Sequence, residues 1–239
     1  MISACKRLIK EAAVQGYCSH EVASAFEQVQ GVKVKALKER QKAHGRTLIS
    51  PDQMRAICTA PDATTLAGKM HRALLATLAG SGCRISEVVS LTPEQIEYGT
   101  DDNGHPGYFL WVRGKNETEA GKRPLSAEAH TLIQQWLTAR SAAGVHSAHI
   151  FTGFTGRGSR GPRLTPICTV SAWEIVQRYS TAAGVPYVKP HDFRRFVGTR
   201  LAREDIRLAQ KALGHKRIET TAAHYVLDDL PLGKTDSLY

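Results

Sequence analysis

The chain has 239 residues, 42% of them hydrophobic, with a formal net charge of +10 and an isoelectric point near 9.5. This length allows one full hydrophobic core and an appendage, and the strong basic charge favours a polyanionic partner, most commonly nucleic acid. Membrane attachment is not expected, because no apolar run approaches the roughly 20 residues of a span and no signal peptide is visible.

The five cysteines are scattered and include no C-x-x-C pair, which predicts a reducing, cytoplasmic environment rather than a disulfide framework.

Residues 1–45 are predicted to form an N-terminal helix, ended by Gly16, and a basic linker. The linker has many charges and few large apolar side chains, so we expect an exposed tether. A second domain, residues 46–226, begins at Ser50-Pro51-Asp52, where Ser50 is suited to cap a helix and Pro51 to its first position. Residues 227–239 form a tail.

A helix is predicted from Thr64 to Ala79, with Gly80 and Gly82 ending it. The sequence Gly82-Cys83-Arg84-Ile85-Ser86-Glu87 follows. Ser86 is expected to cap a short helix, which would leave Arg84 on the preceding turn with its side chain free to reach a ligand.

Residues 95–125 change to the period of strands, with β-rich segments at 96–98 and 108–113 and a third ending at Leu125. They predict a small antiparallel three-stranded sheet. The hairpin between the last two strands holds two candidate lysines, Lys115 and Lys122, and either could also be an ordinary solvated charge.

Two more helices are predicted, at 127–143 and 170–183, separated by a glycine- and arginine-rich surface loop at 153–163. His146 and His149 form an H-x-x-H pair, but no carboxylate or cysteine lies nearby to complete a metal site.

The stretch from His191 to Tyr225 holds the chemistry of greatest interest. His191 and Arg194 lie three residues apart at the start of a predicted helix, whose N-terminal dipole would favour a phosphate. A second helix, about 205–213, is closed by Gly214, and His215 follows. An arginine neutralises phosphate oxygens, a histidine shares a proton and a tyrosine can act as nucleophile, so Tyr225 completes a set suited to phosphodiester cleavage.

These motifs resemble the tyrosine recombinase (phage integrase) family, whose catalytic domain has T/S-G-x-R-x-S-E, a hairpin lysine, H-x-x-R, L-G-H and a tyrosine. The resemblance covers about residues 46–226 and implies a mainly helical α+β fold with a small antiparallel three-stranded sheet. It implies a DNA strand-exchange enzyme that forms a 3′-phosphotyrosine without metal, ATP or other cofactor. The implied partners are double-stranded DNA and further copies of the chain in a tetramer. The matching catalytic residues are Arg84, Lys115, His191, Arg194, His215 and Tyr225, with Lys122 the alternative hairpin lysine.

The position of the tyrosine departs from the commoner family spacing. Counting nine residues from His215 gives His224, whereas Tyr225 lies at ten. We take Tyr225 as the nucleophile, with one extra residue bulging in the turn.

The chain also resembles a recombinase that begins late, since residues 1–45 match only the end of the family's DNA-clamping domain and its linker. Two other functions stay open: a catalytically silent DNA-binding module, which the short N-terminal region could leave, and a type IB topoisomerase, which has a related chemistry without partner exchange. In the family, C-terminal tails dock into a neighbouring protomer, and residues 227–239 could do the same.

Overall fold

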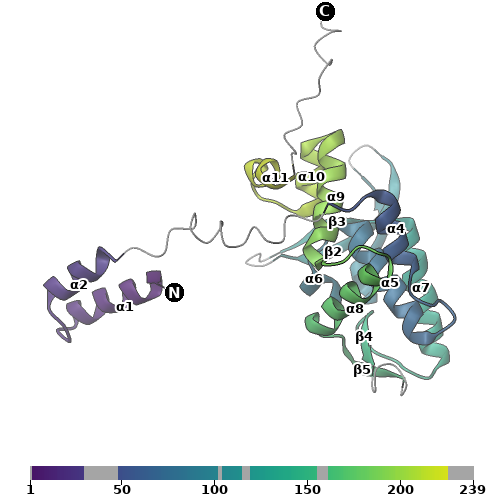
Figure 1. Cartoon of the computed structure of the whole chain (residues 1–239), viewed down its shortest axis with the longest axis horizontal. Coiled ribbons are helices and arrows are strands. Elements are labelled where there is room, and N and C mark those ends of the chain that lie inside the picture. The colour runs from purple at the N-terminus through teal and green to yellow at the C-terminus, as the bar shows by residue number, and fades with distance from the viewer. Residues whose placement is uncertain (1, 30–47, 102–103, 115–118, 155–160, 226–239) are drawn as a thin grey trace, which may run out of the picture. The chain divides into compact units, whose positions relative to one another are not determined.

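The computed structural model describes residues 2–29, 48–101, 104–114, 119–154 and 161–225 (Figure 1). The basic linker and the C-terminal tail lie outside these ranges. The chain divides into two compact units, residues 1–46 and 47–239. None of the helices in the described ranges is long and apolar enough to cross a membrane.

The described part of the first unit, residues 2–29, contains two helices, α1 (Ile2–Val14) and α2 (His20–Glu27), where the sequence predicted one. Helix α2 begins because the Ser19 hydroxyl accepts a hydrogen bond from the Val22 amide, which caps the helix. The two helices contact each other, and the Lys6 ammonium donates to the Glu27 carbonyl. The assignment of this first unit to the end of a DNA-clamping domain stays a prediction.

The second unit is mainly helical, with a small antiparallel sheet, as predicted (Figure 1). Its helices are α4 (Pro51–Thr59), α5 (Leu66–Ser81), α6 (Ile85–Val89), α7 (Ala127–Ala142), α8 (Thr169–Ala182), α9 (Pro190–Glu204), α10 (Ile206–Leu213) and α11 (Ile218–Tyr225), with a 3-10 turn at Pro93–Gln95. The three-stranded sheet has the order β1 (Ile96–Thr100), β2 (Pro106–Arg113), β3 (Ala120–Leu125).

A second sheet of two antiparallel strands, β4 (Thr152–Phe154) and β5 (Pro162–Pro166), was not predicted. The sequence between 153 and 163 is rich in glycine and arginine, a composition typical of loops, and this hid the short pairing on either side. Residues 155–160 lie outside the described ranges.

Helix α5 is the centre of the core, and α4, α7, α8 and α9 all contact it. Its side chains Leu74, Leu75 and Leu78 are fully buried. Burial of each such leucine stabilises the folded state by about 1.5–3 kcal/mol. This packing holds α5 in place and so fixes the positions of its two ends. Trp136 of α7 is also fully buried, and its indole N–H donates to the Ile150 carbonyl at 2.7 Å.

The end of α5 differs from the prediction that Gly80 and Gly82 both terminate it. Gly80 lies inside the helix, where a Cβ atom would collide with the Ser126 hydroxyl. Gly82 ends the helix in the left-handed region at φ +65°. This conformation, which glycine adopts without strain, turns the chain directly into Cys83 and Arg84.

Helices α9, α10 and α11 pack against one another, and β3 contacts α10 (Figure 1). Pro190 occupies the first position of α9, and the Asp192 carboxylate accepts a hydrogen bond from the Lys189 amide at 2.8 Å. Gly214 ends α10 at φ +63°. The segments around residues 84, 194, 215 and 225 are therefore held by neighbouring helix ends.

Candidate active site

Arg84 is held at the start of α6 by Glu87. The two Glu87 oxygens accept hydrogen bonds from the Arg84 backbone N–H and from its guanidinium Nη1, both at 2.7 Å. The expectation that Ser86 caps this helix is wrong: Arg84 is the capping position, because the Glu87 carboxylate reaches back to its amide. The Glu87 side chain is buried, whereas 42% of the Arg84 side chain is exposed, so this arginine can still meet a ligand.

Arg194 joins three parts of the chain. Its Nη1 donates to the Gly82 carbonyl at 2.8 Å, and its Nη2 donates to the Leu213 carbonyl at 2.7 Å. The side chain is 1% exposed. Such burial is tolerated because these carbonyls accept the guanidinium N–H groups. Arg194 thus lies at the junction of the ends of α5 and α10.

Groups of both kinds, some that lower and some that raise its pKa, surround Arg194. Burial lowers the pKa of Arg194, and the like charge of Arg84 lowers it further. Tyr225, which also hydrogen-bonds to Arg194, and Glu87 act in the opposite direction. The buried Arg194 guanidinium and the partly exposed Arg84 guanidinium repel each other, and an anion that contacts both would relieve this repulsion.

His215 follows Gly214 and points its two ring nitrogens to different partners. Its Nε2 lies 3.2 Å from Arg194 Nη2, and its Nδ1 lies 2.9 Å from the Thr221 hydroxyl. An arginine N–H can only donate, so Nε2 is the acceptor and Nδ1 carries the proton. The hydrogen bonds assign this tautomer, and Thr221 fixes the plane of the ring.

Tyr225 is the last residue of α11 and is 3% exposed. The centre of its ring lies 5.6 Å from that of His215. The ring also packs against Gly198 of α9, where a Cβ atom would lie 2.5 Å from the ring. Helix α11 continues without interruption to Tyr225, so no residue bulges within the helix, and an extra residue in the turn that precedes α11 stays a prediction.

The remaining predicted site residues are His191 and the two candidate hairpin lysines, Lys115 and Lys122. His191 is exposed at the second position of α9. Lys115 lies outside the described residues. The Lys122 ammonium lies 5.0 Å from the centre of the Phe109 ring and 5.2 Å from that of Trp111. Lys122 is exposed and its strand neighbour Arg123 is buried, so Lys122 points away from the packed face of the sheet.

The structure therefore brings together Arg84, Arg194, His215 and Tyr225 and adds two residues that sequence reasoning missed, Gly198 and Thr221. A glycine inside a helix costs about 1 kcal/mol relative to alanine, so Gly198 did signal a close approach. Thr221 gave no such signal, since a threonine in a helix is ordinary.

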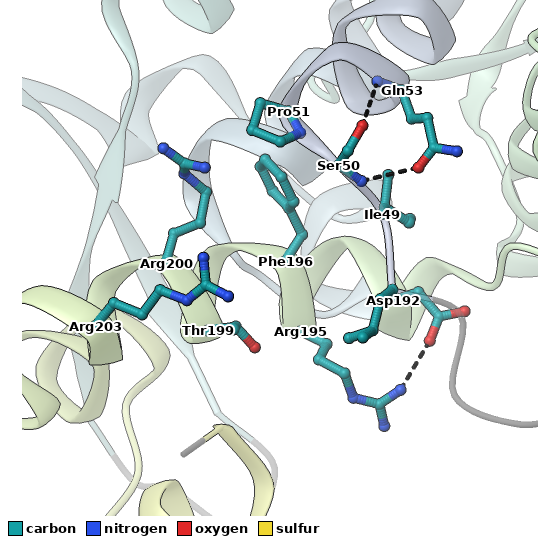
Figure 2. Close-up of a pocket in the computed structure, with 11 residues that line it drawn as sticks. Ile49, Ser50, Pro51, Gln53, Asp192, Arg195, Phe196, Thr199, Arg200 and Arg203 are labelled. Carbon is teal, nitrogen blue, oxygen red and sulfur yellow. Dashed lines mark hydrogen bonds and ion pairs between the residues drawn. The ribbon is translucent and has the colours of Figure 1, made fainter. Parts of the chain in front are cut away.

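A separate cavity of about 330 Å³ is lined by residues of α9 and of the segment that starts α4 (Figure 2). Arg195, Arg200 and Arg203 project around it, with Phe196 against Pro51 of α4. None of the four site residues lines this cavity, so the cavity is separate from the candidate active site. Within the described ranges, no group of three or more His, Cys, Asp or Glu side chains could hold a metal ion. The pair His146 and His149 accordingly forms no part of such a group.

The family model of the phage integrase family matches residues 47–229. The chain belongs to this family. Tyrosine recombinase XerD of Neisseria meningitidis is 28% identical over 177 residues, which cover 73% of this chain and 56% of that protein. Tyrosine recombinase XerC of Azotobacter vinelandii is 26% identical over 244 residues, covering 93% and 75%.

Solved structures of integrase-family proteins share the fold. The site-specific recombinase XerH, bound to palindromic difH in a post-cleavage complex, gives a TM-score of 0.62 at 21% identity, covering 83% of this chain and 55% of that one. A lambda integrase (75–356) dimer bound to a COC′ core site gives 0.60 at 14% identity, covering 97% and 75%. The chain spans only about half the length of several curated relatives, such as 56% of the XerD above and 48% of XerC from Yersinia pestis.

Proposed function

We propose that this chain is the catalytic part of a site-specific DNA recombinase that cuts and rejoins strands through a 3′-phosphotyrosine at Tyr225. The observation that supports this most is the meeting of Tyr225, Arg194 and His215 in one small group at the ends of α9, α10 and α11. Membership of the integrase family supplies the class of reaction.

The scissile phosphate would bind between Arg84 and Arg194. Burial and, after it, repulsion from Arg84 lower the pKa of Arg194, and an anion at this point would relieve the repulsion. Negative charge grows on the non-bridging oxygens in the transition state, and two fixed guanidinium groups stabilise it without reorganising. Glu87 would hold Arg84 in place for this contact rather than react.

The reaction begins when the Tyr225 hydroxyl oxygen forms a bond to phosphorus and the bond from phosphorus to the 5′-oxygen breaks. A phenol has a pKa of about 10, so the hydroxyl needs a proton acceptor at neutral pH, a role we assign to His191. Lys115 donates a proton to the leaving 5′-oxygen. His215 donates a hydrogen bond from Nε2 to the phosphate, which requires Nε2 to take up a proton and to give up its present acceptor contact with Arg194.

Rejoining is the reverse of cleavage, with a 5′-hydroxyl from a partner strand as the nucleophile. The phosphotyrosine bond keeps the energy of the phosphodiester, so no ATP is needed. The cationic side chains stabilise the phosphate charge, so we also propose that the reaction is independent of metal. Exchange of strands between two duplexes needs four cleavages, which favours a tetramer on double-stranded DNA. We expect this to occur in the cytoplasm, at the nucleoid.

The experiment that tests the chemistry needs no knowledge of the target site. Supercoiled plasmid is incubated with the chain in EDTA, the reaction is quenched with detergent, and relaxed and protein-linked DNA are measured. We expect both products from the wild type, neither from Tyr225→Phe, and both from His224→Ala. Loss of the covalent product with His224→Ala and its retention with Tyr225→Phe would contradict the assignment of the nucleophile.

The same assay separates the other functions. Free relaxation of supercoils with no requirement for paired sites would favour a type IB topoisomerase. DNA binding without any covalent product would favour a catalytically silent DNA-binding module.

A further inference from the structure

Arg123 of β3 is a buried cation in a row of apolar side chains. It is 5% exposed and lies opposite Leu110 in the register of β2 and β3. Its neighbours on the same face of the sheet, Leu110, Val112 and Leu125, are all buried hydrophobic residues. Burial of an arginine in such a place costs free energy, because it removes the guanidinium from water. A specific role for this residue is therefore expected.

The guanidinium lies between two glycines. A Cβ atom on Gly121 of the same strand would lie 2.9 Å from Arg123 Nη1, and a Cβ atom on Gly214 would overlap the guanidinium itself. The Nη1 group donates to the Lys122 carbonyl at 2.9 Å. Gly214 is therefore needed twice, for its φ of +63° and for the space that Arg123 fills.

Gly214 directly precedes His215, so Arg123 contacts the turn that places this histidine. Arg194 holds the same turn through the Leu213 carbonyl. Arg123 of β3 and Arg194 of α9 thus both contact the turn at residues 213–215.

Arg123 also contributes to the charge of the site. Burial raises the pKa of the Cys83 thiol, which adjoins Arg84, to about 11, and the positive charges of Arg123 and Arg194 both oppose this rise. The Arg123 guanidinium is therefore close enough to the end of α5 for its charge to be felt there, alongside that of Arg194.

We infer that Arg123 is a positioning residue of the active site: it braces the turn at Gly214 so that His215 meets Arg194 and the scissile phosphate. It also adds a third positive charge behind Arg84 and Arg194. This inference rests on the proposed function for its role in cleavage, whereas the placement of His215 can be tested without DNA.

The variants are Arg123→Met, which keeps the apolar stem and removes the guanidinium, and Arg123→Lys, which keeps the charge. Arg140→Met is the matched control, because Arg140 is also buried but its guanidinium binds the carbonyls of His149, Ile150 and Ser147 instead. It reports what the loss of a buried arginine does to stability alone.

The first measurement is the rate of covalent DNA capture with protein in excess, compared with the affinity for the same DNA. Loss of a group that orients a reacting residue typically costs about 10–100-fold, so we expect a loss of this size in the capture rate of Arg123→Met. We expect its affinity for DNA to change by less than about threefold, since phosphate contacts dominate affinity. Arg123→Lys should recover part of the rate, and Arg140→Met should retain it.

The second measurement is the nitrogen NMR spectrum of His215 in the protein without DNA. The wild type and Arg140→Met should show one tautomer with the proton on Nδ1, whereas Arg123→Met should show averaging of the two tautomers. An unchanged His215 spectrum in Arg123→Met would overturn the positioning role, as would a capture rate within twofold of a wild type that forms the covalent product. If the wild type forms no covalent product, the proposed function fails and the spectrum still decides the placement of His215.

Discussion

The Tyr225 ring lies close to the backbone of α9 and to the His215 imidazole, and Gly198 makes the first contact possible. A β-carbon at position 198 would lie 2.5 Å from the ring, too close for an ordinary contact. The orientation of the proposed nucleophile therefore depends on a residue that has no side chain.

Gly198→Ala tests this dependence. The methyl group should displace the Tyr225 ring, at a cost of about 1–3 kcal/mol, and lower the rate of covalent DNA capture by about tenfold or more. Urea unfolding and the capture assay measure the two effects. The control is the same change in a Tyr225→Ala background, where the ring is absent and the closest remaining contact of the added Cβ atom is Leu213 Cδ1, at 2.8 Å, so the loss of stability should be smaller. An equal loss of stability in both backgrounds would show that the ring is not the cause.

The four site residues that the structure brings together could all be named from the sequence, because their motifs have a specific order and spacing. Arg123 could not, since an arginine in a hairpin is usually a surface charge. One clue was present: Gly121, Arg123 and Leu125 alternate along one face of β3, and Leu125 is a core residue. The role of Lys115 stays a prediction.

At the scale of elements, the start of α9 fixes the positions of His191 and Arg194 relative to each other. Asp192 stabilises this turn in two ways: it accepts from the Lys189 amide at 2.8 Å and forms an ion pair with Arg195 at 3.0 Å (Figure 2). Asp192 is buried, so both contacts lie away from water.

Asp192→Ala should therefore destabilise the protein by about 1–2 kcal/mol, the usual cost of losing a helix cap, and slow capture through the displaced first turn. Asp192→Asn keeps an oxygen that can accept from Lys189 and should lose less. Thermal unfolding and the capture rate are measured for both. Equal stability of Asp192→Ala and the wild type would show that this cap does not hold α9.

Helix ends were the least predictable elements. The helix with Glu87 was expected to begin after Ser86, but a buried carboxylate outweighed the preference of serine for this position. The paired strands β4 and β5 were not predicted, because short strands flanked by glycine and proline show no clear hydrophobic period. In contrast, the long apolar stripe of α5 left little doubt about that helix.

At the scale of the whole molecule, the pH dependence of folding should contain a contribution from His71 of α5. Burial, together with the charge of Arg178, lowers its pKa from 6.5 to about 4, and its Nδ1 lies 2.9 Å from the Tyr179 hydroxyl. The unfolded chain binds this proton more readily than the folded one. His71 thus contributes stability above pH 6.5, and this stability is lost as the pH falls toward 4.

The size of this effect is about 2–3 kcal/mol between pH 7 and pH 4.5. Urea unfolding of the wild type and of His71→Gln at both values isolates it, because all other groups contribute equally to both proteins. The difference in unfolding free energy between the two should shrink at pH 4.5. A constant difference would mean that His71 is protonated in the folded state as readily as in the unfolded one.

The net charge of +10 predicts how the molecule binds DNA. Phosphate contacts release counterions, so we expect the dissociation constant to rise at least about tenfold between about 50 and 200 mM salt. Fluorescence anisotropy with a labelled duplex measures this. Nanomolar binding that salt does not weaken would contradict a mode dominated by phosphate contacts.

Arg194 ties the carbonyls of Gly82 and Leu213, which are 131 residues apart along the chain, while its side chain also faces Tyr225. Replacement by an uncharged residue removes the charge and leaves two buried acceptors without their donor, and lysine lacks the planar guanidinium that reaches both carbonyls. A saturation-mutagenesis screen should therefore score position 194 as intolerant both for protein abundance in cells and for recombination. Tyr225→Phe should separate the two readouts, with normal abundance and no recombination, and is the better choice for trapping a DNA complex.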